Sequence, residues 1–387
     1  MQYFYGEFDG DEFPTQDKLF GFDKLMEFIL QHGEQALQAM EQLMKDGEED
    51  AEIVEKLIQE GLLEKDGQGR LRLTPRAVNR MQLKALQEIF QNMRQGMREG
   101  HTSSTPGVGG ERLEGTRPYQ YGDPIHELDI HQTMHTALQR TGLPQKDEYG
   151  RFRIRFSERD LELHLQEGVT SCSTVVLLDM SGSMMRFGRF YAAKKVAMAM
   201  QQLVNSRFPQ DTIDFVGFYS GASMVPQAAL PLLMPKPVTI FDYSVRMRVP
   251  IAKLAQAPQH FTNLHMGLQL ARKVLKRRGG ENRQILIITD GQPTAHVEGQ
   301  YVYLIYPPDN RSTMATLKEA HLANQEGCRI ATFALIEDYW GMDWVSFVEQ
   351  MNKLTKGIAF YTSAIELAGC IMESYLTGRK KKTYIGT

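Results

Sequence analysis

Five oxygen-bearing side chains stand at three places in the chain where a predicted strand or loop leads into a helix. Asp179, Ser181 and Ser183 form the pattern D-x-S-x-S directly after the apolar run STVVLL, and Asp290 follows the apolar run RQILIIT. Thr262 precedes a predicted helix. Oxygen donors without sulfur or imidazole suit Mg²⁺, with Mn²⁺ or Ca²⁺ as alternatives, better than zinc or copper. The residue types therefore predict a divalent metal site.

The elements that must position these side chains alternate in type from about residue 171 onward. Apolar runs predict strands at 173–178, 212–218, 283–289, 302–306, 329–335 and 358–361. Amphipathic runs predict helices at 188–205, 263–277, 313–326 and 342–354. This order predicts a Rossmann-like α/β fold with a doubly wound, mostly parallel sheet, whose ligands bind beyond the carboxyl ends of the strands. Residues 220–250 do not fit the alternation, and we expect an edge strand or an insertion there.

The rest of the chain divides by composition into three further regions. Residues 1–100 are mainly helical in periodicity, and 101–170 form a linker, rich in Gly, Ser and Thr at 101–115, with a connecting helix and strand segment. The α/β domain covers 171–378, and 379–387 form a basic tail. We therefore expect a helical N-terminal domain followed by a C-terminal α/β domain.

A possible winged helix lies inside the N-terminal region. The helix-like run AEIVEKLIQEGLLEK is followed by DGQG, RLRLTP and a second helix, which predicts a short hairpin between two helices. The first helix carries Glu52, Glu55 and Glu60, whose charges repel phosphate, and the whole chain has a net charge of -3. We expect packing or docking from this domain and no nucleic-acid binding.

Composition restricts the cellular setting. The chain has 387 residues and three widely spaced cysteines, which cannot form a disulfide scaffold. The acidic, glycine-broken N-terminal run does not resemble a signal peptide, and no apolar run approaches the roughly 18 residues of a membrane span. These features predict a cytoplasmic protein without a membrane segment.

The order D-x-S-x-S, then Thr, then Asp-Gly resembles the metal-ion-dependent adhesion site of von Willebrand factor A (VWA) domains. The resemblance covers roughly half of the chain. It implies that Asp179, Ser181, Ser183, Thr262 and Asp290 bind Mg²⁺ directly or through water, and that an acidic residue of a partner protein completes the coordination. We assign the rim around this site, where a partner would bind, to Met180, Gly182, Gly291 and His265.

The layout of the whole chain resembles a narrower group. A helical N-terminal region, the segment R-P-Y-x-Y-G-D-P and a C-terminal VWA domain are similar to bacterial CoxE-like proteins and, more distantly, to the VWA-bearing component of magnesium chelatase. That resemblance implies a cytoplasmic partner of the MoxR-type AAA+ ATPases, or the client of such an ATPase, in protein remodelling or metal insertion.

Two functions follow from these patterns. We expect a non-enzymatic, Mg²⁺-dependent adaptor, because the glycine-rich loop continues with Glu111 and Arg112 where a Walker A loop needs Lys and Ser or Thr. The alternative is a metal-dependent phosphoester hydrolase, in which the ion activates water. That mechanism also needs a general base, and no histidine or carboxylate in the sequence is convincingly placed for it.

Overall fold

The computed structural model describes residues 16–46, 51–92, 112–119, 128–142, 145–146, 152–153, 156–166, 171–279, 282–336, 342–364 and 366–377. Contacts divide the chain into two compact units. One unit joins residues 1–99 with 171–378, and the other comprises 100–170 with 379–387. The N-terminal helices and the C-terminal α/β region therefore belong to the same unit.

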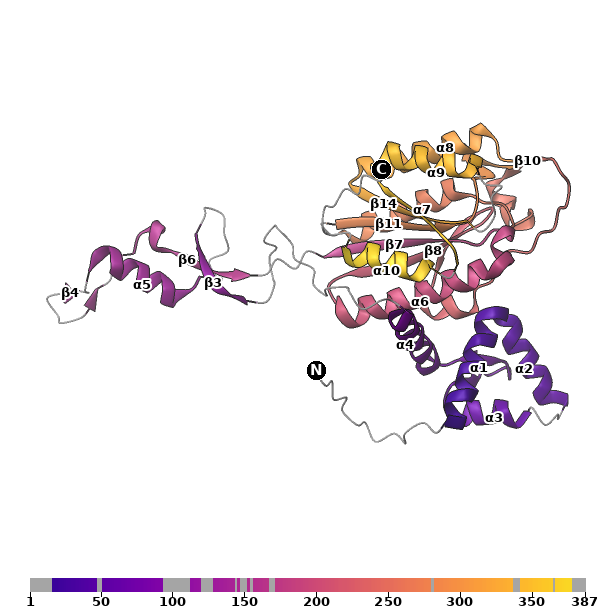
Figure 1. Cartoon of the computed structure of the whole chain (residues 1–387), viewed down its shortest axis with the longest axis horizontal. Helices are drawn as coiled ribbons and strands as arrows, with labels where there is room; N and C mark the ends of the chain where they lie inside the picture. Colours follow the sequence, from indigo (N-terminus) through magenta and orange to yellow (C-terminus); the bar gives the residue numbers. More distant parts are fainter. Residues whose placement is uncertain are drawn as a thin grey trace. The chain divides into compact units, whose positions relative to one another are not determined.

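A six-stranded sheet in the order β15-β14-β11-β7-β8-β9 forms the centre of the first unit (Figure 1). Its strands are β7 (Cys172–Asp179), β8 (Thr212–Phe218), β9 (Ala222–Val225), β11 (Asn282–Thr289), β14 (Cys328–Leu335) and β15 (Ile358–Thr362). Every neighbouring pair is parallel except β8 and β9. The predicted doubly wound α/β fold is confirmed, and β9 is the edge strand expected within 220–250.

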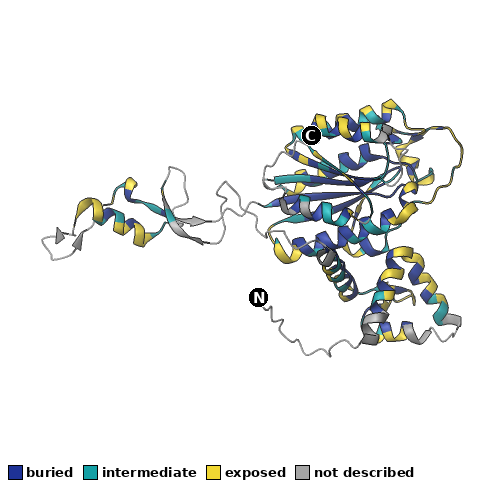
Figure 2. Ribbon diagram, in the orientation of Figure 1, coloured by how far each residue is buried: buried dark blue, intermediate teal, exposed yellow. Residues whose placement is uncertain are grey.

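Helices cover both faces of this sheet, which explains why its central strand is apolar throughout. Successive residues of β7 alternate between two clusters, with Val176 and Leu178 in one and Val175 and Leu177 in the other. The first cluster packs under α6 (Arg189–Arg207) and α10 (Leu367–Thr377). The second packs under α7 (Leu264–Arg278), α8 (Asn310–Gln325) and α9 (Met342–Thr355). Figure 2 shows the buried layer between these helices and the strands.

The strand predicted at 302–306 forms, but outside the parallel sheet. It is β13 (Tyr301–Tyr306), which pairs antiparallel with β10 (Val245–Pro250) and β12 (Ala295–Glu298) in a separate three-stranded sheet. A two-residue turn joins β12 to β13, and Gly299 in that turn has a positive φ of 59°. Such a turn fits an antiparallel hairpin, because a parallel neighbour needs a long crossover.

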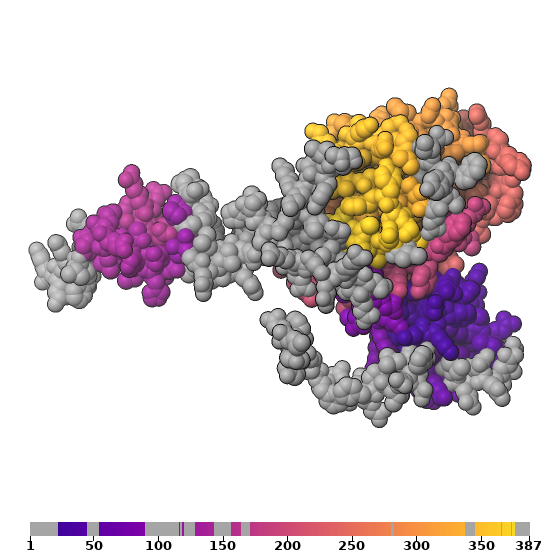
Figure 3. All heavy atoms as spheres, viewed as in Figure 1, coloured from indigo at the N-terminus to yellow at the C-terminus, as the bar shows by residue number. Residues whose placement is uncertain are grey.

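The N-terminal helices pack on the α6 side of the same unit. They are α1 (Gln16–His32), α2 (Glu34–Asp46), α3 (Ala51–Gln59) and α4 (Pro75–Asn92). The predicted hairpin between α3 and α4 is confirmed as β1 (Leu63–Lys65) and β2 (Leu71–Leu73). Helix α4 contacts α6 directly, and the space-filling view shows the indigo helices lying against the sheet region (Figure 3). This face of the sheet region is therefore covered by the chain itself.

The described residues of the second unit form two short antiparallel strand pairs and one α-helix. Strand β3 (Arg112–Pro118) pairs with β6 (Glu162–Gln166), β4 (Gln145–Lys146) pairs with β5 (Phe152–Arg153), and α5 (Ile130–Thr141) lies between β3 and β4 in sequence. Most of the loop expected over 101–115 lies outside the described residues, as does the tail 379–387, and residues 112–115 belong to β3 instead. Across the described parts of the chain, no helix has the length and apolar character to span a membrane.

Candidate metal centre at the ends of β7 and β11

Asp179 ends β7 with a fully buried side chain. Both of its carboxylate oxygens accept hydrogen bonds: Oδ1 from the backbone N–H of Ser181 at 2.8 Å, and Oδ2 from the hydroxyl of Thr289 at 2.6 Å. Thr289 is the last residue of the adjacent strand β11. The carboxylate is therefore fixed between the ends of two neighbouring parallel strands, where ligands bind in this class of sheet.

A chain of hydroxyls joins the D-x-S-x-S loop to the second carboxylate. The Oγ atoms of Ser181 and Ser183 lie 3.1 Å apart, and the Ser183 hydroxyl donates to Oδ1 of Asp290 at 2.8 Å. Ser181 is buried, and the side chain of Asp290 is fully covered. The structure thus brings together four of the five predicted oxygen donors, from segments more than 100 residues apart.

Thr262 borders the same rim through its backbone. Its N–H donates to Oγ1 of Thr294 at 2.8 Å, and its carbonyl accepts from Thr294 and Ala295 in the segment that follows Asp290. Two residues earlier, the carbonyl of His260 accepts from Gly182 at 3.1 Å. Thr262 therefore lies in a loop tied to both sides of the site, while its hydrogen bonds to other described residues run through the main chain.

Arg189 is a residue at this site that the sequence patterns did not indicate. It begins α6, is buried, and donates from Nη1 to Oδ2 of Asp290 at 2.8 Å. Its guanidinium also lies 5.1 Å from the ring centroid of Phe187, an exposed residue with a positive φ of 55°. The signal available in the sequence was a basic residue at the start of the helix that directly follows the D-x-S-x-S loop.

The predicted rim residues have different surroundings. Met180 is buried in the core, where its sulfur fills the space left by Gly217 of β8, so its side chain does not line an exposed rim. Gly182 is tightly packed, since an added Cβ would lie 2.5 Å from Cγ2 of Val238. An added Cβ at Gly291 would meet nothing within 4 Å. Close packing therefore requires glycine at 182 and not at 291.

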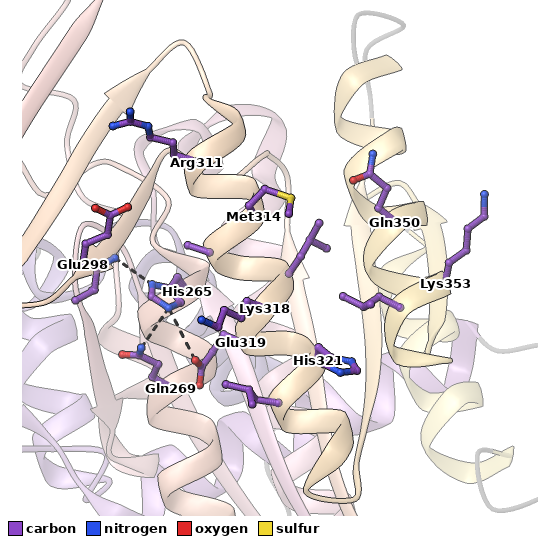
Figure 4. A pocket seen from close by; sticks show the side chains of 15 residues that line it. His265, Gln269, Glu298, Arg311, Met314, Lys318, Glu319, His321, Gln350 and Lys353 are labelled. Carbon is purple, nitrogen blue, oxygen red and sulfur yellow. Dashed lines mark hydrogen bonds and ion pairs between the residues drawn. The ribbon is translucent and has the colours of Figure 1, made fainter.

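His265 also differs from the expected rim position. It is buried in the first turn of α7, and its Nδ1 accepts from the backbone N–H of Val297 at 3.0 Å. Figure 4 shows its ring directed toward Glu319 of α8 and Gln269 of α7. The helix begins at Leu264, so its first turn directs His265 toward β12 and into a groove beside α8. His296, near it, is likewise buried and lies 2.9 Å from the Ser312 hydroxyl.

The electrostatics of the rim favour a cation. Burial, reinforced by the negative charge of Asp290, raises the pKa of Asp179 to about 7. Two covered carboxylates meet there with one guanidinium and several hydroxyls, and the donor set is all oxygen. These donors fit a hard divalent cation such as Mg²⁺. Nowhere in the described residues, this rim included, do three His, Cys, Asp or Glu side chains gather in a way that could hold a metal, so an ion at the rim would need the hydroxyls as ligands beside the two carboxylates.

Comparisons with known proteins agree with this architecture. The sequence profile for the vWA domain of Rv0959-like proteins matches residues 172–376, and the profile for the third domain of those proteins matches 111–165. The uncharacterized protein Rv0959 of Mycobacterium tuberculosis (strain ATCC 25618 / H37Rv) is 28% identical over 331 residues, which cover 83% of this chain and 44% of the relative. The chain thus spans less than half the length of the curated relatives it matches.

Solved structures with a similar fold are more distant. The vWF domain of the type V pili tip protein Mfa5 from Porphyromonas gingivalis is 15% identical with a TM-score of 0.36, covering 55% of this chain and 98% of that one. The PilB minor pilin from Streptococcus sanguinis is 12% identical with a TM-score of 0.40, covering 59% and 66%. The vWA profile, by contrast, matches more than half of this chain. The chain therefore belongs to the family of Rv0959-like vWA-domain proteins.

Proposed function

We propose that this protein is a non-enzymatic adaptor that binds Mg²⁺ at the Asp179 rim and, through the ion, an acidic residue of a partner protein. Asp179, Ser181, Ser183 and Asp290 would hold the ion, with Thr262 as the fifth donor. When bound, the ion supplies a positive charge and an open coordination position that a carboxylate can fill. The vWA domains to which this region belongs generally mediate protein–protein interactions, which supports a binding role.

The strongest support is that the covered carboxylates of Asp179 and Asp290, at neighbouring strand ends, are linked through Ser181 and Ser183 of a single loop. Such an arrangement concentrates negative charge where water is largely excluded, and a divalent cation offsets it. The chain's own residues order the donors before binding, since Ser181 and Thr289 already hold the carboxylate of Asp179. A preordered site of this kind loses little conformational entropy on binding.

The proposed partner is a MoxR-type AAA+ ATPase or the client of such an ATPase, in protein remodelling or metal insertion in the cytoplasm. The resemblance of the layout to CoxE-like proteins supports this assignment. The loop that continues with Glu111 and Arg112 lacks the residues for binding ATP phosphates, so the motor would be a separate protein.

The test is binding of the full chain to a MoxR-type ATPase encoded in the same genome, measured by pull-down and by biolayer interferometry. Binding in about 5 mM Mg²⁺ should be lost in EDTA and on Asp179→Ala, because both remove the bridging ion. Glu64→Ala removes an exposed carboxylate of β1 and should leave binding unchanged. Thermal unfolding of each variant checks the fold. Full binding in EDTA would contradict the proposal.

A metal-dependent phosphoester hydrolase is the second candidate, and one histidine gives it a specific basis. The Cβ of His260 lies 3.3 Å from the point where a side chain at Gly182 would begin. Burial lowers the pKa of His260, which keeps the ring neutral near pH 7 and able to accept a proton. Hydrolysis of p-nitrophenyl phosphate with Mg²⁺ or Mn²⁺ that disappears on His260→Ala would favour this function over the adaptor.

A further inference from the structure

A groove crosses the outward side of α8, and of the four predicted rim residues only His265 lines it. Helix α9 borders it on one side, and β12 with the start of α7 borders it on the other (Figure 4). Its volume is about 1300 Å³. Small-molecule pockets usually measure roughly 300–1,000 Å³ and enclose their ligand, so an open groove of this size suits a segment of polypeptide better.

The groove has an apolar lining with unusual exposure. Met314 of α8 and Leu354 of α9 have 65% and 41% of their surface exposed, although both lie where two helices meet. The other apolar lining residues are Val297, Ala315, Leu317 and Leu322. Methionine adapts its shape to different apolar surfaces. This lining can therefore receive the apolar side of an amphipathic helix.

The charges along the groove are unequally compensated. Among the described residues, the side chains of Arg311, Lys318 and Lys353 form no ion pair. Of the two acidic lining residues, Glu319 pairs with the guanidinium of Arg272, while Glu298 lies 3.2 Å from Nε2 of His296, a contact that is an ion pair only when the histidine is protonated. The described groove therefore has three basic side chains outside ion pairs against the one carboxylate of Glu298, so its excess charge is positive, on both α8 and α9.

A group of ion pairs beneath the groove strengthens this asymmetry. Arg272 contacts both Glu319 and Glu326, and Glu326 also contacts Lys276. These two basic side chains of α7 and the two acidic side chains of α8 and its C-terminal end thus neutralise one another. None of their negative charge remains to compensate Lys318 or Lys353, and both lysines are exposed.

We propose that this groove is a docking site for an acidic amphipathic helix of a partner protein. Apolar side chains of that helix pack between Met314 and Leu354, while its carboxylates lie against Lys318, Lys353 and Arg311. Nucleic acid or an anionic membrane would use the cations but would leave the apolar lining without a role. The proposal does not depend on the metal site, because none of the five predicted metal donors lines the groove.

The test uses the full chain and a fluorescein-labelled helical peptide of about 16 residues, long enough to form a helix, with leucines along one side and glutamates along the other. Fluorescence anisotropy should give micromolar affinity that persists in EDTA and in Asp179→Ala. The double variant Lys318→Glu/Lys353→Glu should weaken binding at least about tenfold, because two attractions become repulsions. Lys273→Glu/Arg277→Glu, an equal charge change on the exposed side of α7, should not.

Two further measurements separate a helix site from a merely cationic surface. Met314→Ser/Leu354→Ser should also weaken binding about tenfold, and both residues are exposed enough to be changed without loss of the core. A peptide of identical composition in scrambled order should bind about tenfold more weakly. Equal binding of the scrambled peptide, displacement by a single-stranded oligonucleotide of equal charge, or absence of binding by the amphipathic peptide would overturn the proposal.

Discussion

The Asp179 rim and the α8 groove belong to one vWA unit and contain charge in opposite arrangements. At the rim, acidic groups are buried and held by hydrogen bonds, and Arg189 is the cation that contacts Asp290. Along the groove, Glu319 is paired with Arg272, and the basic side chains of Arg311, Lys318 and Lys353 are exposed. This difference in charge underlies the two proposals, a cation as ligand at the rim and an acidic segment as ligand at the groove.

The two regions also differ in how strongly a ligand should depend on single residues. Buried charges cannot be compensated by water, so removing one donor at the rim changes the site as a whole. Exposed cations are screened by solvent and salt, so each contributes modestly. We therefore expect large effects from single substitutions at the rim and smaller, additive effects at the groove.

The largest effect should come from Asp179→Asn. The amide keeps the size of the side chain but removes the negative charge, so affinity for Mn²⁺, measured by isothermal titration calorimetry, should fall at least about 100-fold. Asp309→Asn, which alters an acidic residue at the start of α8, is the control and should leave the affinity unchanged. Equal affinities of the Asp179→Asn variant and the parent chain would remove the rim from consideration as a metal site.

Competition between the metal ion and a proton for the carboxylate of Asp179 should give the next largest effect. Because the pKa of Asp179 is raised to about 7 in the folded protein, a metal ion must displace a proton below that pH. Affinity for Mg²⁺, measured by calorimetry across a pH series, should therefore fall about tenfold for each pH unit below about 7 and level off above it.

The same raised pKa makes the stability of the metal-free protein fall as the pH rises, whereas the affinity for Mg²⁺ increases. A carboxyl group whose pKa rises from 3.8 to about 7 on folding stabilises the fold at low pH, and this stabilisation is lost as pH rises through about 7. The increase in Tm produced by Mg²⁺ should consequently be greater at about pH 7.5 than at about pH 5.5. An increase that does not vary with pH would show that Asp179 does not bind the ion.

The sequence predicted that Asp179 and Asp290 lie at one edge of the sheet because their positions depend on local pattern. Asp179 and Asp290 each follow an apolar strand, and the parallel register of β7 and β11 places their ends side by side. Met180 and His265 could not be placed in this way. Met180 turns into space left by Gly217 on another strand, and His265 depends on the backbone of Val297. Contacts between distant segments decide both positions.

The sequence likewise predicted the strands but not which strands pair with one another in every case. The apolar run at 302–306 predicts a strand equally well in a parallel sheet or in a hairpin, and the preceding Gly299 turn decides between them. The groove depends on how α8 and α9 lie against each other. That packing is set by residues of both helices and of the sheet below, so no single pattern of apolar residues indicates it.

Arg189→Gln tests whether the guanidinium at the rim opposes metal binding. The guanidinium competes with a metal ion for Oδ2 of Asp290, so replacing it by a neutral side chain should raise Mn²⁺ affinity about tenfold. Arg186→Gln, an exposed arginine on the same loop, is the matched control. Weaker metal binding by Arg189→Gln would instead mean that Arg189 chiefly holds Asp290 in position.

The smallest effect should come from added salt. The salt dependence of binding can be measured at both the groove and the rim, so it compares the two regions directly. Raising NaCl from about 0.1 M to about 0.5 M shortens the Debye length from about 10 Å to about 4 Å, which screens exposed charges more than buried ones. Binding of the acidic peptide to the groove should weaken about fivefold, since Lys318 and Lys353 face solvent. Mn²⁺ binding at the rim should change by less than about twofold, because the carboxylates of Asp179 and Asp290 are covered. If both ligands responded alike, burial would not be what distinguishes the two sites.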